Sequence, residues 1–375
     1  MGLLLAGVAA TPAHAETIRA QQWHLDAMKA DEIWKISTGK GVTVAVIDGG
    51  VKEIPELEGQ IVPGKDFLAA DGDGRTDEGG HGTTMAALIA GTGKHPTGDG
   101  GYGLAPGAKI LPIRVSDQQQ TTPSWAAAIR HAANSEAKVI NISLGMVSDP
   151  ADDQLRREAV EYALSKGKLV FASAGNTGDA LNRVEYPAAT PGVIGMGAVD
   201  SNGEPTKESQ HGPQVDLAAP GIDIVTACGG KTGICKGHGT SDATALASAS
   251  AALLWAAHPD WTNNQVLRVL LNTAGKPVDG SGRNDYVGYG VVRPRVALQT
   301  PGDPGPADVY PLPDLAAAAP PPTQAPTPAP GDKAATAPKS DDSTTPWTGT
   351  GIGLGLAACV LIGGAVTAAL VRRNR

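Results

Sequence analysis

The sequence predicts an α/β fold built around a mainly parallel sheet. Three observations support this fold class. About 285 residues between the two ends share one composition, which is enough for one large domain with a substantial core. Within this block, apolar runs of strand length alternate with helical stretches, as in βαβ units. The first such run, Val42–Ile47, is mostly apolar and β-branched, which is typical of a strand buried on both faces.

The predicted elements follow the same alternation along the chain. Strands are apolar runs bounded by glycine or polar turns, and they are expected at 42–47, 109–115, 139–142, 169–172 and 193–199. Helices are longer stretches without internal glycine or proline, and they are expected at 26–34, 84–90, 124–133, 152–165, 242–258 and 262–274. Gly91 terminates one helix, and Thr262 is a candidate N-cap of the last.

Charge and cysteine content exclude some classes of protein. The net charge is −8, and no basic stripe is present, which argues against a nucleic-acid partner. Three cysteines are too few for a disulfide scaffold. Cys228 and Cys235 lie close together in a glycine-rich loop, and in an oxidising compartment they are expected to form a disulfide. A zinc pair with the nearby His238 is the alternative, although no second cysteine pair accompanies it.

Both ends of the chain differ from the central block. Ala13-His14-Ala15 follows an apolar stretch and matches a signal-peptidase site, although a basic region before it is missing. Proline is frequent from residue 301, and an uncharged apolar stretch long enough to span a bilayer follows. The predicted organisation is a signal peptide at 1–15, one globular domain at 16–300, a Pro/Ala-rich linker at 301–346, a transmembrane helix at 347–371 and a cytoplasmic tail at 372–375. The tail carries three arginines, which places the domain outside the cell membrane.

Four polar residues stand where predicted strands and loops end. Asp48 follows the strand 42–47, His81 and Ser241 each precede a helix, and Asn176 follows the strand 169–172. A serine hydroxyl becomes a nucleophile when an imidazole takes its proton, and a carboxylate holds that imidazole. An amide and a backbone N–H stabilise the resulting oxyanion. Taken alone, Ser241 could instead be a helix N-cap; the other three residues favour the catalytic interpretation.

Five motifs carry a resemblance to a known family. Val44–Val51, His81–Thr83, Asn141–Gly145, Ala174–Asn176 and Gly239–Ser241 resemble the motifs of the subtilisin-like serine proteases, in the order Asp, His, Ser. The resemblance covers roughly residues 20–300. It implies a three-layer subtilisin-like fold, a serine endopeptidase and no required cofactor. It further implies that two segments line the substrate cleft: Ser143, Leu144 and Gly145, and Ser173, Ala174 and Gly175.

Within that family the chain most resembles the mycosins, the membrane-anchored proteases of type VII secretion systems. This narrower resemblance rests on the signal peptide, the linker and the C-terminal membrane helix. It also rests on the short distance between residue 15 and Gln22, which leaves no room for the folded pro-domain that the mycosins are described as lacking. The resemblance implies protein or peptide substrates, attachment to the cell membrane and association with the secretion machinery.

Two features depart from the family pattern or remain open. Asp242 follows Ser241 where subtilases commonly carry an apolar residue; it either raises the pKa of His81, favours a basic group on the leaving side of the substrate, or simply stabilises the helix N-terminus. Asp71-Gly72-Asp73-Gly74 begins like a calcium loop but lacks the expected glutamate, so a solvated acidic loop is favoured over bound calcium and no metal site is assigned.

The expected function is that of a membrane-anchored extracellular serine endopeptidase that cleaves proteins secreted by the same cell. Two rivals remain. One is a structural stabiliser of a secretion complex whose proteolysis is dispensable, and the other is a general extracellular or leader-peptide protease.

Overall fold

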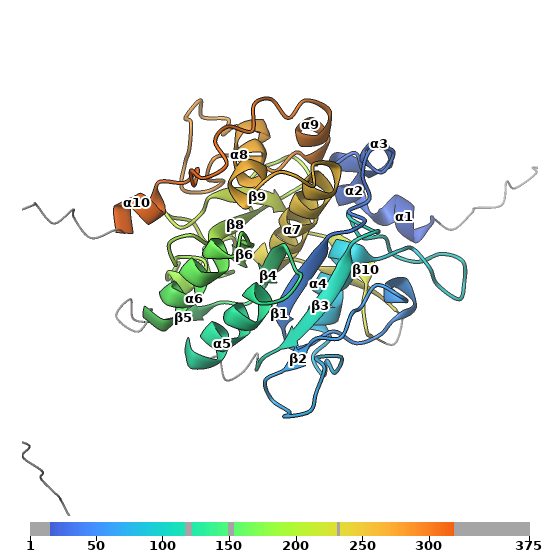
Figure 1. Ribbon diagram of the computed structural model, residues 1–375. Helices are drawn as coiled ribbons and strands as arrows, with labels where there is room; N and C mark the ends of the chain where they lie inside the picture. The colour runs from blue at the N-terminus through green and yellow to red at the C-terminus, as the bar shows by residue number, and fades with distance from the viewer. Residues whose placement is uncertain (1–15, 117–121, 149–153, 231–232, 319–375) are drawn as a thin grey trace, which may run out of the picture. The chain divides into compact units, whose positions relative to one another are not determined.

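A computed structural model describes residues 16–116, 122–148, 154–230 and 233–318 (Figure 1). The predicted signal peptide, transmembrane helix and cytoplasmic tail lie outside these residues, as does the predicted linker from residue 319 onward. Among the helices that are described, none combines the length and the apolar character needed to cross a bilayer.

Seven parallel strands form the central sheet. In spatial order they are β2 (Lys65–Asp66), β3 (Lys109–Arg114), β1 (Thr43–Asp48), β4 (Val139–Ile142), β6 (Leu169–Ser173), β8 (Ile194–Val199) and β9 (Leu217–Pro220). The chain leaves β1 toward β3 on one side and later returns to β4 on the other. Functional sites of open α/β sheets lie at the carboxyl ends of strands beside such a reversal. The predicted parallel α/β fold is confirmed.

Helices cover both faces of the sheet. Alternate residues of β1 enter two separate cores: Val44 and Val46 belong to one, Ala45 and Ile47 to the other. The first core contains α4 (His81–Ala90), α7 (Thr240–Ala257) and α8 (Asn263–Thr273), and the second contains α5 (Thr122–Ala133) and α6 (Gln154–Ser165). Figure 1 shows α5 and α6 together on one side of the sheet. The molecule therefore has the three layers expected of the subtilisin fold.

Strongly patterned elements match their predicted positions, and the N-terminal helix does not. Thr262 caps α8 through a reciprocal capping box with Gln265, as expected. The helix predicted over 26–34 is instead two short helices, α2 (Trp23–Ala27) and α3 (Ala30–Ile33), which follow α1 (Ile18–Gln21). Lys29 separates them with a left-handed φ of 61°. The break allows Leu25 and Ile33 both to be buried, and so tertiary packing overrides local helix propensity.

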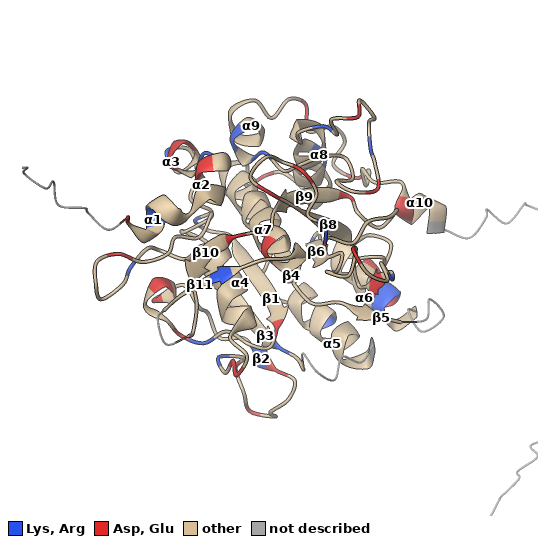
Figure 2. Ribbon diagram, turned by 180° about the vertical axis from the view of Figure 1, so that it is seen from behind, with Lys and Arg blue, Asp and Glu red and all other residues tan. Residues whose placement is uncertain are grey.

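Several short elements lie in regions that the sequence analysis leaves as loops. They are η1 (Pro55–Leu57), β5 (Met146–Val147), β7 (Glu185–Tyr186), β10 (Ile224–Ala227), β11 (Ile234–Gly237), α9 (Pro294–Gln299) and α10 (Asp314–Ala318). β5 pairs with β7, and β10 pairs with β11, both in antiparallel register. Strands of two to four residues are too short to show a periodic pattern in the sequence, so these pairings are not predictable from it. Over the described residues, basic and acidic positions are interspersed along the ribbon (Figure 2).

The first part of the predicted linker packs on the peptidase domain. The Arg268 guanidinium of α8 donates to the carbonyl oxygens of Pro304 and Pro306, at 2.6 and 2.9 Å. Leu312 is only 3% exposed and belongs to the main core. Asp314 accepts a hydrogen bond from the Gly192 amide at 2.5 Å. Although proline-rich, this segment satisfies its backbone carbonyls with side chains of the domain and so remains attached to it beyond residue 300.

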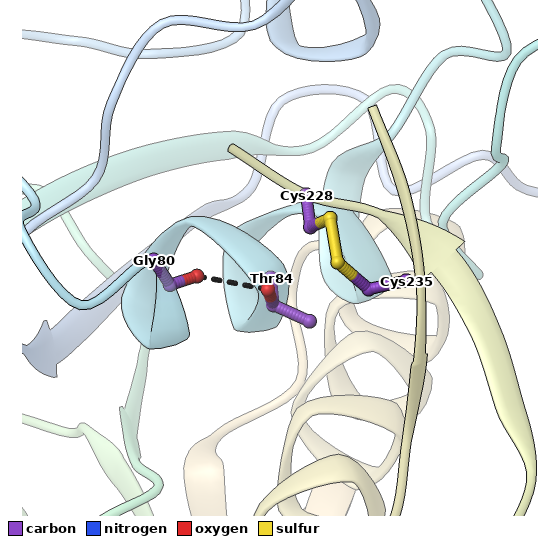
Figure 3. Close-up of a disulfide and its surroundings, with 4 residues drawn as sticks. All are labelled: Gly80, Thr84, Cys228 and Cys235. Atoms are coloured by element: carbon purple, nitrogen blue, oxygen red, sulfur yellow. Dashed lines mark hydrogen bonds between the residues drawn. A yellow bond between two sulfur atoms is a disulfide. The ribbon is translucent and has the colours of Figure 1, made fainter. Parts of the chain in front are cut away.

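A disulfide closes the β10–β11 hairpin. Cys228 and Cys235 are joined, with 5.8 Å between their Cα atoms, as predicted. Their sulfurs are therefore not free to ligate zinc. Figure 3 shows the disulfide beside α4, close to Thr84, whose hydroxyl donates to the Gly80 carbonyl at 2.8 Å. The hairpin packs on α4, which carries His81, and its second strand, β11, leads directly into the turn before Ser241.

We expect the double variant Cys228→Ser/Cys235→Ser to unfold more easily. Opening a loop of this size raises the entropy of the unfolded chain, which lowers the free energy of unfolding by about 2–3 kcal/mol. Urea denaturation followed by tryptophan fluorescence measures the difference. A reducing agent should shift the wild-type midpoint by the same amount and leave the double variant unchanged. Equal midpoints for the variant and the oxidised wild type would contradict the expectation.

Candidate active site

Asp48 and His81 form a hydrogen-bonded pair at the carboxyl end of β1. The Asp48 side chain is buried, and both of its oxygens lie at hydrogen-bond distance from His81 Nδ1, at 2.9 and 3.0 Å. His81 is the first residue of α4. A Cβ on Gly82 would overlap the Gly50 carbonyl oxygen and lie 2.9 Å from Asp48 Cβ. Glycine at position 82 therefore lets the start of α4 approach β1 closely enough for the pair to form.

Asp77 fixes the first turn of α4, a role that the sequence analysis missed. Its carboxylate accepts hydrogen bonds from the backbone amides of Gly80 and Thr83, each at 2.8 Å. Gly80 occupies the N-cap position, where it has no side chain to satisfy these donors. An aspartate three residues before a glycine N-cap, which has no side chain to accept a hydrogen bond, is a signal that could have revealed this role. Asp77 thereby holds the backbone that carries His81.

Ser241 lies in the first turn of α7. The N-cap position is Gly239, so the alternative interpretation of Ser241 as an N-cap is wrong. The Ser241 hydroxyl donates to the carbonyl oxygen of Ser143 at 3.0 Å, and the Ser143 hydroxyl donates to the carbonyl oxygen of Ser241, also at 3.0 Å. Among the described residues no hydrogen bond joins Ser241 to His81. Rotation about χ1 redirects a serine hydroxyl, and catalytic hydrogen bonds often form only once substrate is bound.

A series of buried hydrogen bonds holds the backbone of Ser241 in place. Ser248 Oγ donates to Asn141 Oδ1, and Asn141 Nδ2 donates to Ser143 Oγ, both at 3.0 Å. Ser143 in turn bonds the carbonyl of Ser241. All three supporting side chains are buried, so each has a partner rather than water. These hydrogen bonds tie the end of β4 to the start of α7.

Asn176 lies against the same first turn of α7. Its Oδ1 accepts hydrogen bonds from the Thr240 amide at 2.8 Å and from the Thr240 hydroxyl at 3.0 Å. Within the described residues its Nδ2 makes no hydrogen bond, and the residue is exposed. Because Oδ1 is held by Thr240, Nδ2 is the group left to donate to a reacting oxygen.

The two segments expected to line the substrate cleft both contact the start of α7. Ser143 meets Ser241 as described, and the Gly175 amide donates to Thr240 Oγ1 at 3.1 Å. Leu144 and Gly145 are half-buried, whereas Ser173, Ala174 and Gly175 are buried. The structure therefore brings these two segments to either side of the Thr240–Ser241 turn.

The electrostatics of the site favour a protonated imidazole. The negative charge of Asp48 raises the pKa of His81 to about 9, against the opposing effect of burial, and Asp242 and Asp77 add to the rise. Burial raises the pKa of Asp242 to about 7, with the nearby charges of His81 and His238 opposing the rise. Asp242 is 2% exposed, and its Oδ2 has no hydrogen-bond partner among the described residues. Asp242 is thus placed to act on His81, the first of the effects anticipated for it.

This arrangement predicts an alkaline pH dependence. His81 accepts the serine proton only when it is neutral, so kcat/KM should rise with pH by about tenfold per unit below the midpoint. The side chain is 42% exposed, and water weakens the pull of Asp48, so we expect a midpoint above 6.5 and no higher than about 9. Folding stability should change in the opposite direction. The stabilisation from protonated His81 is complete below pH 6.5 and is lost as the pH rises through the folded-state pKa.

The variant Asp242→Asn tests how much Asp242 contributes to the raised pKa of His81. Removing the charge should move the rising limb of the pH–rate profile to lower pH, so that activity at pH 7 increases. The exposed Asp26 on α2 provides the matched control, Asp26→Asn, which should leave the profile unchanged. Superimposable curves for Asp242→Asn and wild type would reject the coupling.

The candidate calcium loop makes contacts that need no metal. Asp73 accepts a hydrogen bond from the Arg75 amide at 3.2 Å, and its carboxylate lies 3.4 Å from the Arg75 guanidinium. In the described part of the chain, no group of three or more His, Cys, Asp or Glu side chains is arranged to hold a metal ion.

The model of the Subtilase family matches residues 39–290. The chain is 36% identical over 326 residues to Mycosin-1 of Mycobacterium tuberculosis, covering 73% of this chain and 72% of that protein. Among solved structures, it is similar to MycP1 with the N-terminal propeptide removed, with 35% identity, a TM-score of 0.66 and coverage of 76% of this chain and 99% of that one.

A further similarity is to a chain of a larger assembly. The periplasmic assembly of the ESX-5 inner membrane complex contains a chain 30% identical to this one, with a TM-score of 0.68 and coverage of 86% of this chain and 92% of that one.

Proposed function

We propose that this chain, which belongs to the subtilase family and is a subtilisin-type serine protease, is a membrane-anchored endopeptidase that cleaves secreted proteins outside the cytoplasm. The observation that carries the proposal is the Asp48–His81 pair at 2.9 Å, together with a serine in the first turn of a buried helix. A serine with a purely structural role would not need the Asp48–His81 pair at the same sheet edge. A purely structural Asp48–His81 pair would not need the glycine-rich turn that precedes Ser241.

In the proposed mechanism Ser241 attacks the peptide carbonyl carbon. His81 Nε2 takes the hydroxyl proton and then gives it to the leaving amine, while Asp48 bonds Nδ1, fixes the tautomer and stabilises the imidazolium. The Asn176 Nδ2 group and the Ser241 amide donate to the oxyanion, which the positive end of the α7 dipole also stabilises. Water then attacks the acyl-enzyme. His81 takes a proton from the water and gives it to the Ser241 oxygen, which leaves as the acid product is released.

The proposed location rests on two features of the sequence. The predicted signal peptide at 1–15 favours export of the domain, and the predicted transmembrane helix at 347–371 favours anchoring by one helix. Similarity to a chain of the ESX-5 inner membrane complex supports association with a type VII secretion system. The proposed substrates are proteins that leave the cell through that system.

Labelling with a fluorophosphonate tests the chemistry directly. The reagent reacts with a serine only when an adjacent base activates it, so we expect a single adduct, mapped by mass spectrometry to Ser241. Labelling at the exposed Ser201 or at no serine would overturn the assignment. Peptide profiling separates the remaining enzymatic rival, because broad digestion indicates a general extracellular protease.

The similarity to a subunit of a membrane complex also favours a second role, as a stabiliser of the secretion machinery. A strain carrying Ser241→Ala distinguishes the roles. If secretion persists in that strain but fails in a deletion strain, the structural role dominates; if both strains fail, proteolysis is required.

A further inference from the structure

One acidic side chain lies between the two segments that flank the nucleophile. Ser143–Gly145 follows β4 and bonds Ser241, and Ser173–Gly175 follows the neighbouring strand β6 and bonds Thr240. The resemblance to the subtilisin-like proteases implies that the substrate side chain preceding the scissile bond lies between these two segments. Whatever polar group borders that space selects this side chain.

Glu185 borders that space on both sides. A Cβ on Gly145 would overlap Glu185 Oε2, and a Cβ on Gly175 would lie 2.8 Å from Glu185 Cδ. The carboxyl group therefore contacts the backbone of both segments at the positions where they carry no side chain. Gly175 has a φ of 114°, which other residues rarely adopt, so the close approach is built into the backbone.

The position of Glu185 is fixed by its surroundings. β7 pairs with β5, which begins directly after Gly145, so the backbone of Glu185 cannot drift from the cleft. The side-chain Nε2 group of Gln210 donates to Glu185 Oε1 at 2.7 Å, and the backbone N–H of Gln210 donates to the Gly175 carbonyl oxygen at 2.9 Å. Gln210 is itself buried, which leaves Glu185 Oε2 as the oxygen available to a ligand.

In the described part of the chain the Glu185 carboxylate has no basic partner: no Lys or Arg forms an ion pair with it, and Oε2 accepts no hydrogen bond. The residue is half-buried, and this burial raises its pKa, with the hydrogen bond from Gln210 opposing the rise. A carboxylate partly withdrawn from water and without a counter-ion favours an incoming positive charge.

We propose that Glu185 determines specificity by favouring Lys or Arg immediately before the scissile bond. The inference rests on the proposed function and names its substrate class. A long basic side chain places its aliphatic stem between the two glycine-containing segments and its cationic head against Oε2. Aspartate and glutamate at the same substrate position would face like-charge repulsion.

A matched set of fluorogenic peptides tests the proposal on the full chain. The peptides differ only in the residue before the cleaved bond, which is Lys, Gln, Leu, Ala or Glu. For the wild type we expect kcat/KM to be at least tenfold higher for Lys than for Leu, and lowest for Glu. The isosteric Glu185→Gln should lower kcat/KM for the Lys peptide by about tenfold or more and leave the Leu peptide within twofold. Glu161→Gln, an exposed acid on α6, is the control and should change nothing.

Two further measurements separate the possible failures. The wild-type ranking of peptides needs no variant, and a preference for Ala or Leu that Glu185→Gln leaves unchanged would overturn the inference while the protease remains established. The fluorophosphonate labelling rate of Glu185→Gln should equal that of the wild type, which shows that the variant folds. If the wild type cleaves no peptide and Ser241 takes no label, the proposed function itself fails.

Discussion

Ser241→Ala is expected to lower kcat by about 10⁶-fold, the size of the loss known for the triad serine of subtilisin. Without the hydroxyl, no acyl-enzyme forms, and the remaining groups act only by binding the oxyanion and the substrate. Hydrolysis of a fluorogenic peptide at the alkaline end of the pH range measures the loss most sensitively, because His81 is then neutral in a larger fraction of molecules. The fluorophosphonate adduct should also disappear.

The matched control is a buried serine of the same helix. Ser250 donates to the Leu246 carbonyl at 2.8 Å and contacts none of the proposed catalytic groups. Ser250→Ala should keep wild-type activity, and both variants should keep the wild-type melting temperature within a few degrees, since each loses one hydrogen bond. Residual activity above about 1% in Ser241→Ala would show that another group is the nucleophile.

The central strands are predictable from the sequence because a strand buried on both faces is a nearly continuous run of apolar residues. β1 and β4 are apolar runs whose ends coincide with their predicted ends within one residue. The seven-strand order was not predictable at the far edge, where β9 is a four-residue strand among glycines and prolines. Its pairing with β8 depends on contacts between segments distant in sequence, and no local pattern records them.

At the site, too, residues placed by a local sequence pattern are predictable, whereas those placed by contacts between distant segments are not. Asp48 and His81 were predictable as partners because the end of a parallel strand and the start of a helix meet at one sheet edge. Glu185 was not predictable, since its side chain reaches Gly145 only through the β5–β7 pairing, and two-residue strands carry no periodicity. A residue that acts across a tertiary contact is visible only once both chain segments are placed.

Asn176→Ala is expected to lower kcat by about 100- to 1000-fold, the loss found for one oxyanion donor in subtilisin, with little change in KM. The reason is geometric. Oδ1 is held by two hydrogen bonds from Thr240, at 2.8 and 3.0 Å, so the amide cannot turn, and Nδ2 is the group that remains for the oxyanion. Because charge develops on that oxygen only in the transition state, the loss appears in kcat. Steady-state kinetics on one peptide measures it.

Alanine at this position removes two functions at once, and aspartate separates them. Asn176→Asp keeps an oxygen for Thr240 but replaces the Nδ2 donor with a second acceptor. If donation to the oxyanion is the catalytic role, Asn176→Asp should be at least as slow as Asn176→Ala, while its stability stays near that of the wild type. Asn176→Ala should be less stable by about 1 kcal/mol, the value of one acceptor at a helix N-terminus. An aspartate variant that remains active while the alanine variant does not would assign Asn176 a structural role, and the Ser241 amide would then have to bind the oxyanion without it.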